Sequence, residues 1–209
     1  MVWRQSVPKA VLPLLKIAKA VATPAATSPD LPPDLVDECR FCASRLDMLD
    51  RLAKGGRIAE IGTQRGHFAG AILDRVRPDE LHLVDVDFGS TRQDVLSNPK
   101  VRTHQGLSGA ILPGFEAESF DWIYVDADHS YAGVRGDASL AARAVRPGGL
   151  LIFNDFAHAD PFFGRYGVHR AVTEFATRER WPFVWFAYEP NGLYDVALRR
   201  PLDWTPPPG

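Results

Sequence analysis

The sequence predicts an α/β fold, in which a mostly parallel β-sheet lies between two layers of helices and ends in an antiparallel hairpin strand. Residues 57–88 carry the first signal, because they read as strand, glycine turn, helix and strand, and such a βαβ unit makes its two strands parallel. The second signal lies near the carboxyl end. There Asn191 and Gly192 separate two β-prone runs, 183–188 and 193–198, and this pattern predicts a hairpin.

Length and composition describe one globular domain. The chain has 209 residues, of which 45% are hydrophobic and 24% are charged, so it is long enough to bury a core of its own. The net charge of −2 gives no support for nucleic acid or an anionic membrane as a partner. Two cysteines cannot form a disulfide framework, and we therefore expect a cytoplasmic protein.

Residues 1–33 differ from the rest of the chain because they are rich in alanine and proline. The apolar run 9–22 is too short to span a bilayer, and it contains Lys16 and Lys19, which also disfavour a signal peptide. We expect a mobile arm at 1–33 that covers the substrate or a partner subunit, followed by a single domain at 34–205. A homodimer stays open.

The first helix of this domain is predicted to run from Asp34, as its N-cap, to about Lys54. Its apolar stripe includes Cys39 and Cys42 at helical spacing. A C-x-x-C pair can serve redox chemistry or bind zinc, but no second Cys/His cluster completes a zinc site and no thioredoxin-like strand precedes the pair. We therefore expect both thiols to pack in the core.

The βαβ unit also predicts a ligand site. In open α/β sheets, ligands bind beyond the carboxyl ends of the strands, and glycines such as Gly62 and Gly66 let the backbone come close to them. Asp85 stands at the tip of the next strand, roughly 20 residues past the glycine turn. An acid in this place suits the two hydroxyl groups of a ribose.

The spacing of the glycines disfavours a dinucleotide. A dinucleotide fingerprint needs a glycine and a small residue at the positions that Gln64 and His67 occupy. What remains is the pattern E-x-G-x-x-x-G, which runs from Glu60 to Gly66. This pattern resembles motif I of the class I S-adenosylmethionine (AdoMet) methyltransferases, in which Asp85 would be the ribose-binding acid.

Three later blocks extend the resemblance, and they come in the right order. They are VDADHSYAGVRGD at 125–137, RPGGLLIFNDF at 146–156 and GVHRAVTEF at 167–175. The blocks are similar to small-molecule O-methyltransferases of the macrocin O-methyltransferase-like group and, more distantly, to catechol and caffeoyl-CoA O-methyltransferases. The resemblance spans roughly residues 55–200. It implies the Rossmann-like three-layer α/β/α methyltransferase fold.

The resemblance implies AdoMet as the cofactor. The loop after the third strand then lies beside the adenine. Many relatives carry an acid where this chain has Leu107, so we expect the adenine amino group to bond to backbone or to Ser108. The predicted cofactor-binding residues are Glu60, Gly62, Thr63, Gln64, Gly66, Asp85, Val86, Gly106, Leu107, Ser108 and Asp126.

The resemblance also implies a divalent metal, usually Mg²⁺, held by an acid after the fourth strand and an acidic or amide pair after the fifth. The matching residues are Asp126, Asn154 and Asp155, whose oxygens are ligands that Mg²⁺ accepts. The order Asn-Asp departs from both related patterns, two acids or Asp-Asn, and leaves the individual roles open. Alternatively, the two acids cap the segments that follow them.

The implied reaction is O-methylation of a small-molecule or sugar hydroxyl. The enzyme must align nucleophile, methyl and sulfur, and a metal or a base must help the hydroxyl lose its proton. The candidate catalytic residues are Asp126, His129, which follows the fourth strand, and His158, three residues past Asp155. Nearby aromatic residues could line an apolar or sugar-stacking pocket; they are Tyr131, Phe162, Phe163 and Tyr166.

Three alternatives stay open. The first is a metal-free AdoMet methyltransferase that uses a histidine base. The second is a non-catalytic domain that binds AdoMet or another nucleotide, against which the acids at the strand tips argue. The third is a nucleotide-binding oxidoreductase, which Gln64 and His67 disfavour.

Overall fold

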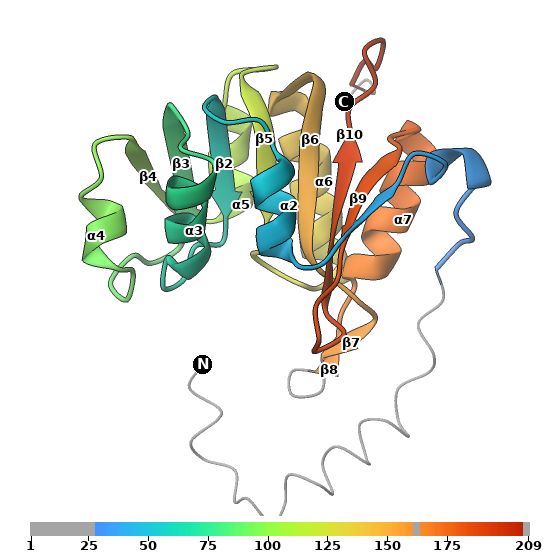
Figure 1. The fold of residues 1–209 in the computed structure, drawn as a ribbon, viewed down its shortest axis with the longest axis horizontal. Coiled ribbons are helices and arrows are strands. Elements are labelled where there is room, and N and C mark those ends of the chain that lie inside the picture. The colour runs from blue at the N-terminus through green and yellow to red at the C-terminus, as the bar shows by residue number, and fades with distance from the viewer. Residues whose placement is uncertain (1–27, 161–163, 207–209) are drawn as a thin grey trace, which may run out of the picture.

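A computed structural model describes residues 28–160 and 164–206, and its main feature is an eight-stranded sheet with the order β1-β9-β10-β6-β5-β2-β3-β4 (Figure 1). Each of these strands runs parallel to its neighbours except β10, which is antiparallel to both β6 and β9. The predicted fold class is therefore confirmed, including the antiparallel hairpin strand. The strands are β1 Arg40–Cys42, β2 Arg57–Ile61, β3 Glu80–Asp85, β4 Val101–Gln105, β5 Phe120–Val125, β6 Val145–Phe156, β9 Phe183–Ala187 and β10 Tyr194–Arg199.

Helices cover both faces of the sheet. Figure 1 shows α2 and α3 on one side and α6 on the other. The two core clusters agree with this view, since one joins α2 and α3 to the sheet and the other joins α6 and α7 to its opposite face. The helices are α2 Arg45–Arg51, α3 His67–Arg75, α4 Gln93–Leu96, α5 Ser108–Ile111, α6 Tyr131–Ala144 and α7 Val168–Glu179, with 3₁₀ turns η2 Pro33–Leu35 and η3 Leu112–Gly114 and a small hairpin of β7 Ala159–Asp160 with β8 Gly164–Arg165.

The predicted helix from Asp34 to Lys54 is wrong. This segment holds η2, then the short edge strand β1, and only then α2, whose N-cap is Ser44. The Ser44 hydroxyl accepts a hydrogen bond from the Asp47 amide at 3.1 Å, and this bond starts the helix where propensity alone did not place it. Residues Arg40–Cys42 become a strand because they pair with β9, which is distant in sequence.

The two cysteines pack as predicted, although not on one helix. Both thiols are free. Cys42 is fully buried in the cluster of α2 and α3, whereas Cys39 lies partly buried against the cluster on the other face. This result follows from β1 being a strand, in which side chains alternate between faces.

The predicted arm at 1–33 lies mostly outside the described residues. Its described end, from Ser28, contacts the folded domain. The Ser28 hydroxyl lies 2.7 Å from Nδ1 of His169 in α7, and Leu31 packs against the core cluster of α6 and α7. Among residues 28–160 and 164–206, no helix is long and apolar enough to cross a bilayer.

The buried His82 of β3 and the half-buried His104 of β4 form a pair. The Nδ1 atom of His82 is 2.9 Å from Nε2 of His104, and the two rings stack at 5.0 Å. Burial lowers the pKa of His82 below its ordinary value, and the charge of Arg57 adds to this effect against the opposing Glu80. Burial and the neighbouring His82 likewise lower the pKa of His104.

Because of this pair, acidic pH lowers the stability of the folded protein. A histidine whose folded pKa is lowered stays neutral while the unfolded chain takes up a proton, so its contribution to stability is lost as the pH falls below about 6.5. We expect His82→Gln to reduce the loss of unfolding free energy between pH 7.5 and pH 5.5, measured by urea titration. The exposed His67 provides the control, because His67→Gln should leave that loss unchanged. An equal pH dependence in wild type and His82→Gln would contradict this account.

Candidate active site

The carboxyl ends of β2 and β5 lie in contact, and a glycine makes this possible. The backbone amide of Asp126 donates to the carbonyl of Ile61 at 2.7 Å. Gly62 has φ +91°, and a Cβ on it would lie 2.2 Å from the Asp126 carbonyl oxygen. A side chain at this position would therefore separate the two strand tips. The predicted motif glycine thus allows the carboxyl ends of β2 and β5 to lie in contact.

Asp85 holds the glycine loop to the tip of β3. Its Oδ2 accepts hydrogen bonds from the backbone amides of Thr63 at 2.8 Å and Gln64 at 2.7 Å, and its Oδ1 accepts one from the amide of Asp87 at 3.1 Å. A carboxylate has about four lone-pair sites, so these bonds leave capacity for a ligand hydroxyl. The predicted ribose-binding acid therefore also fixes the loop that follows β2.

An apolar platform flanks this loop. Val86 and Leu107 follow the adjacent strands β3 and β4, where Asp85 is paired with Gln105. Their exposed fractions are 58% and 71%, which is high for large apolar side chains. Ser108 begins α5 directly behind Leu107. These side chains offer a flat aromatic ring an apolar surface beside polar partners.

Glu60 is a buried acid with an unsatisfied oxygen. Glu60 is only 1% exposed, and its Oε2 has no hydrogen-bond partner. Burial raises the pKa of Glu60 well above the ordinary value of a glutamate, and repulsion by Asp126 adds to this. An orphaned buried carboxyl oxygen costs free energy, and a ligand that donates a hydrogen bond to it would recover that cost.

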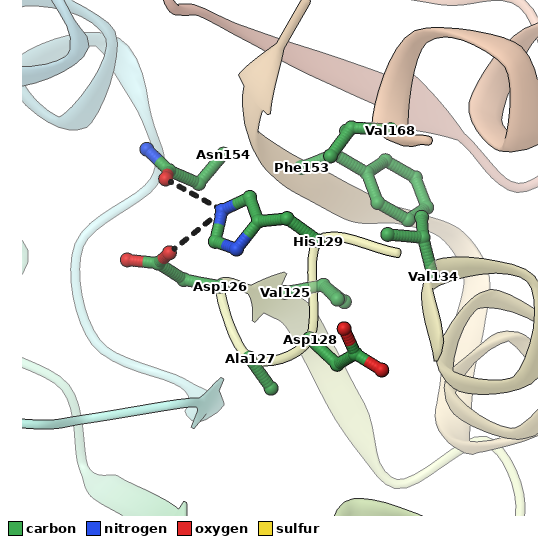
Figure 2. A pocket seen from close by; sticks show the side chains of 9 residues that line it. All are labelled: Val125, Asp126, Ala127, Asp128, His129, Val134, Phe153, Asn154 and Val168. Atoms are coloured by element: carbon green, nitrogen blue, oxygen red, sulfur yellow. Dashed lines mark hydrogen bonds and ion pairs between the residues drawn. The ribbon is translucent and has the colours of Figure 1, made fainter. Parts of the chain in front are cut away.

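His129 is the centre of a second cluster, formed by the tips of β5 and β6 (Figure 2). Its Nε2 lies 3.4 Å from Oδ1 of Asp126, 3.5 Å from Oδ2 of Asp155 and 3.5 Å from Oδ1 of Asn154. The ring stacks on that of Tyr166 at 4.6 Å. Figure 2 shows Asp128 turned away from this cluster, and its carboxylate instead accepts from Ser130 at the start of α6.

The charges in this cluster support one another. Burial raises the pKa of Asp126, and its contact with His129 opposes that rise. Burial also raises the pKa of Asp155 to about 6, again against His129. For His129, burial lowers the pKa, but the two carboxylates outweigh it and leave the pKa above the ordinary value of a histidine. The imidazole is therefore a stronger base than a free histidine.

The predicted metal ligands converge, but a histidine nitrogen stands between them. Asp126, Asn154 and Asp155 lie 3.4–3.5 Å from His129 Nε2, whereas Mg²⁺ takes its oxygen ligands at about 2.1 Å. Within the described part of the chain, no group of three or more His, Cys, Asp and Glu side chains is arranged to hold a metal ion. With His129 turned inward, this arrangement does not fit a bound cation.

A buried hydrogen-bond network fixes Asn154. Its Nδ2 donates to the hydroxyl of Tyr124 at 3.1 Å and to Oδ1 of Asp195 at 3.0 Å, and the Tyr124 hydroxyl donates to Oδ2 of Asp195 at 2.6 Å. Because the amide nitrogen is used twice, Oδ1 of Asn154 is the atom that faces His129. The network explains why an amide, and not a second acid, stands at position 154.

A β-bulge creates this network. Between the pairs Tyr194↔Phe156 and Val196↔Phe153, β10 has one residue, Asp195, where β6 has two, Asn154 and Asp155. The extra residue bends the strand, and Asp155 adopts φ +54° there. The bulge turns the Asn154 amide into the sheet toward Asp195 and the Asp155 carboxylate toward His129.

The other predicted residues lie around these two clusters. The structure brings His129 into contact with the predicted acids, whereas the exposed His158 packs its ring on His169 of α7 at 4.0 Å. The Tyr131 hydroxyl donates to Glu174 of α7 at 2.5 Å. Phe162 and Phe163 lie outside the described residues.

Sequence reasoning missed three polar residues of the site, namely Arg45, Tyr124 and Asp195. Asp195 did leave a signal, because it is a single acid in an otherwise apolar strand of the hairpin. Tyr124 looks like an ordinary aromatic residue of a β-prone run. Arg45 lies in a segment whose secondary structure was predicted wrongly, so its position could not be inferred.

Comparisons with known proteins agree with this geometry. Residues 59–156 match the protein family described as "Methyltransferase domain". This match begins within β2 and ends at the tip of β6, and it therefore includes the glycine loop, Asp85 and the His129 cluster. No curated protein matches the chain.

Solved structures show the same fold with three acceptor chemistries. NodS, an N-methyltransferase from Bradyrhizobium japonicum WM9 solved with S-adenosyl-L-homocysteine (SAH), is 19% identical, with 75% of this chain and 86% of that chain covered and a TM-score of 0.57. An O-methyltransferase family protein from Burkholderia thailandensis is 14% identical (75% and 55% covered, TM-score 0.56). The CurJ carbon methyltransferase is 15% identical (75% and 52% covered, TM-score 0.56).

These likenesses define the class of fold. The chain has the fold of AdoMet-dependent methyltransferases, and residues 59–156 match a methyltransferase domain. The chain spans about half the length of CurJ and of the Burkholderia protein. The atom that accepts the methyl group differs among the three proteins, so the fold alone does not name it.

The network of Asn154 is open to a direct test. Asn154→Asp would place a second carboxylate about 3 Å from Asp195, and we expect a loss of roughly 3 kcal/mol in unfolding free energy at pH 8. The double variant Asn154→Asp with Asp195→Asn exchanges donor and acceptor, so it should recover most of that loss. Urea titration of wild type, both single variants and the double variant measures this coupling. A double variant no more stable than the weaker single variant would contradict the network.

Proposed function

We propose that this protein is an AdoMet-dependent methyltransferase that methylates a hydroxyl group of a small molecule or sugar. The observation that carries the proposal is the position of His129. Its Nε2 is held among three oxygens at the tips of β5 and β6, beside the glycine loop that begins the cofactor half of the site. The chain thus has a base next to the place where a methyl donor would lie.

The residues around the glycine loop fit AdoMet. Asp85 can accept hydrogen bonds from the ribose hydroxyls, and the exposed Val86 and Leu107 offer an apolar surface to the adenine. The unsatisfied Oε2 of Glu60 suits the ammonium group of the methionyl end. The fold of NodS, which was solved with the product SAH, supports the same class of cofactor. AdoMet supplies the methyl group on a positively charged sulfur.

The chain's own residues would then handle alignment and the proton. The methyl transfer that AdoMet would supply needs the acceptor hydroxyl to lose a proton. Nδ1 of His129 would take this proton, because Nε2 donates its own proton to the oxygens around it. Asp126 and Asp155 stabilise the imidazolium that results, since both carboxylates lie within 3.5 Å of Nε2. The ring of Tyr166 holds the imidazole from its face. The stacking leaves His129 one orientation in which to meet the acceptor.

A metal-assisted form of the reaction is the second candidate. The observation that favours it is the convergence of Asp126, Asn154 and Asp155 on one point. The His129 ring would have to rotate away before a cation could approach these oxygens. Mg²⁺ assistance therefore stays a prediction, and we base no step on it.

The cofactor assignment predicts a binding defect. Asp85→Ala removes both the ribose acceptor and the bonds that hold the glycine loop, so we expect a 10- to 100-fold weaker affinity for SAH, from the order of a lost charge-assisted hydrogen bond. Titration calorimetry measures this, with NAD as the ligand that should not bind. The exposed neighbour Asp87 provides the control variant, Asp87→Ala. Unchanged SAH affinity in Asp85→Ala would remove the ribose assignment.

The two forms of the reaction separate on chelation. Because His129 Nε2 already stands among the three oxygens, we expect turnover of a true acceptor to persist in EDTA and to fall about 100-fold or more in His129→Ala. SAH affinity should be similar in both cases. Turnover that is lost in EDTA and returns with Mg²⁺ would instead establish the metal-assisted form. Activity that survives in His129→Ala would show that His129 is not the base.

A further inference from the structure

Arg45, the first residue of α2, is a cation whose charge acts on the buried acids of the site. Its guanidinium lies over the ring of Phe68 at 5.2 Å, and Phe68 belongs to the first turn of the helix that follows the glycine loop. The ring of Phe68 in turn packs against that of Tyr124 in β5 at 4.2 Å. Arg45 is therefore linked through Phe68 to both the helix after the glycine loop and β5.

The surroundings of Arg45 are rich in negative charge. Its Nε lies 4.0 Å from Oε1 of Glu189, and its charge acts on Glu60, Asp126 and Asp195. Even so, 38% of its side chain is exposed, so the guanidinium is accessible to a ligand from solvent. A strongly charged group that is partly open to solvent, above a site with an unsatisfied acid, is placed to meet a ligand that carries both signs of charge.

The order of the strands determines which end of the cofactor reaches Arg45. Val86 and Leu107 follow β3 and β4, the last two strands on one side of the sheet, and we assigned them to the adenine. Asp85 on β3 takes the ribose. The remaining methionyl chain must extend toward β2 and β5, where Glu60 and Tyr124 are directly paired across the strands. Arg45 lies over Phe68, whose ring packs against that of Tyr124 at 4.2 Å.

We propose that Arg45 binds the carboxylate of the methionyl end of AdoMet, while Glu60 receives its ammonium group. This inference rests on the proposed cofactor and adds the residue that reads its amino-acid portion. The guanidinium presents a planar pair of donors that matches a carboxylate. Glu60 alone would attract the ammonium group and repel the carboxylate, so the zwitterion needs a cation in this place.

Two ligands that differ only in the amino-acid portion test the proposal without any turnover assay. SAH carries the amino-acid portion, and 5′-methylthioadenosine has the same adenosine and sulfur without it. By calorimetry, Arg45→Gln should weaken SAH about 10- to 100-fold and change 5′-methylthioadenosine less than about threefold. Arg45→Lys, which keeps the charge and loses the fork, should fall between wild type and Arg45→Gln.

The control variant is Arg51→Gln on the same helix, since Arg51 is bonded to Asp47 at 3.0 Å and rests on Trp185 at the outer side. It should bind both ligands as wild type does. A second comparison removes the carboxylate from the ligand. Wild type should bind AdoMet more tightly than decarboxylated AdoMet, and Arg45→Gln should bind the two alike.

Each result decides between distinct claims. Equal weakening of SAH and 5′-methylthioadenosine in Arg45→Gln would mean that Arg45 only supports the fold, and it would overturn the inference. Unchanged SAH affinity would overturn it as well. If wild type binds neither ligand, the proposed cofactor is wrong. If Arg45→Gln does not fold, the preference of wild type for AdoMet over its decarboxylated form, and the intermediate behaviour of Arg45→Lys, still test the claim.

Discussion

Buried polar side chains at one end of the sheet are the constraint on which the site depends. Glu60, Tyr124, Asn154 and Asp195 come from four successive strands in the order β2, β5, β6 and β10, and all are buried. Polar groups in such positions cost free energy unless they are bonded. Three of the four satisfy one another, whereas Glu60 keeps an open oxygen. The sheet is therefore internally satisfied at β5, β6 and β10 and incomplete at β2.

The loop that carries His129 is held mainly by backbone contacts. The Asp126 amide bonds to β2, and the His129 carbonyl accepts from the amide of Gly167 at 2.8 Å. Gly167 lies so close to the loop that a Cβ on it would be 2.1 Å from the backbone nitrogen of Tyr131. These contacts leave the loop little freedom, so the position of the imidazole follows from the packing of α7 against the tip of β5.

Much of the fold was readable from sequence because its signals are local. The βαβ unit ending in Asp85 and the hairpin at Asn191 are both short patterns with a direct physical meaning, and both are present. Residues 34–54 failed because their apolar spacing also fits a helix, while the strand at Arg40–Cys42 exists only through its pairing with β9. Local propensity contains no information about such a partner.

The residues of the candidate site likewise divide into those that local sequence signals could predict and those that they could not. Asp85 and the glycines could be placed because motif and fold lie within one stretch of chain. The convergence of Asp126, Asn154 and Asp155 followed from strand order, as neighbouring tips must meet. The role of Asp195 could not be read, since it depends on a one-residue bulge between β6 and β10 that sets which side chain faces which.

Synthesis of the chain delivers the two halves of the site at different times. Strands β2, β3 and β4, with the loop at Leu107, are complete about halfway along the sequence, whereas Asp195 arrives with the last strand. Until β10 forms, one edge of β6 is unpaired and the Asn154 amide has no carboxylate to hold it. The hairpin therefore pairs the free edge of β6 and orients the Asn154 amide in a single event. A nascent chain that already carries β2, β3 and β4 still lacks an ordered Asn154 side chain.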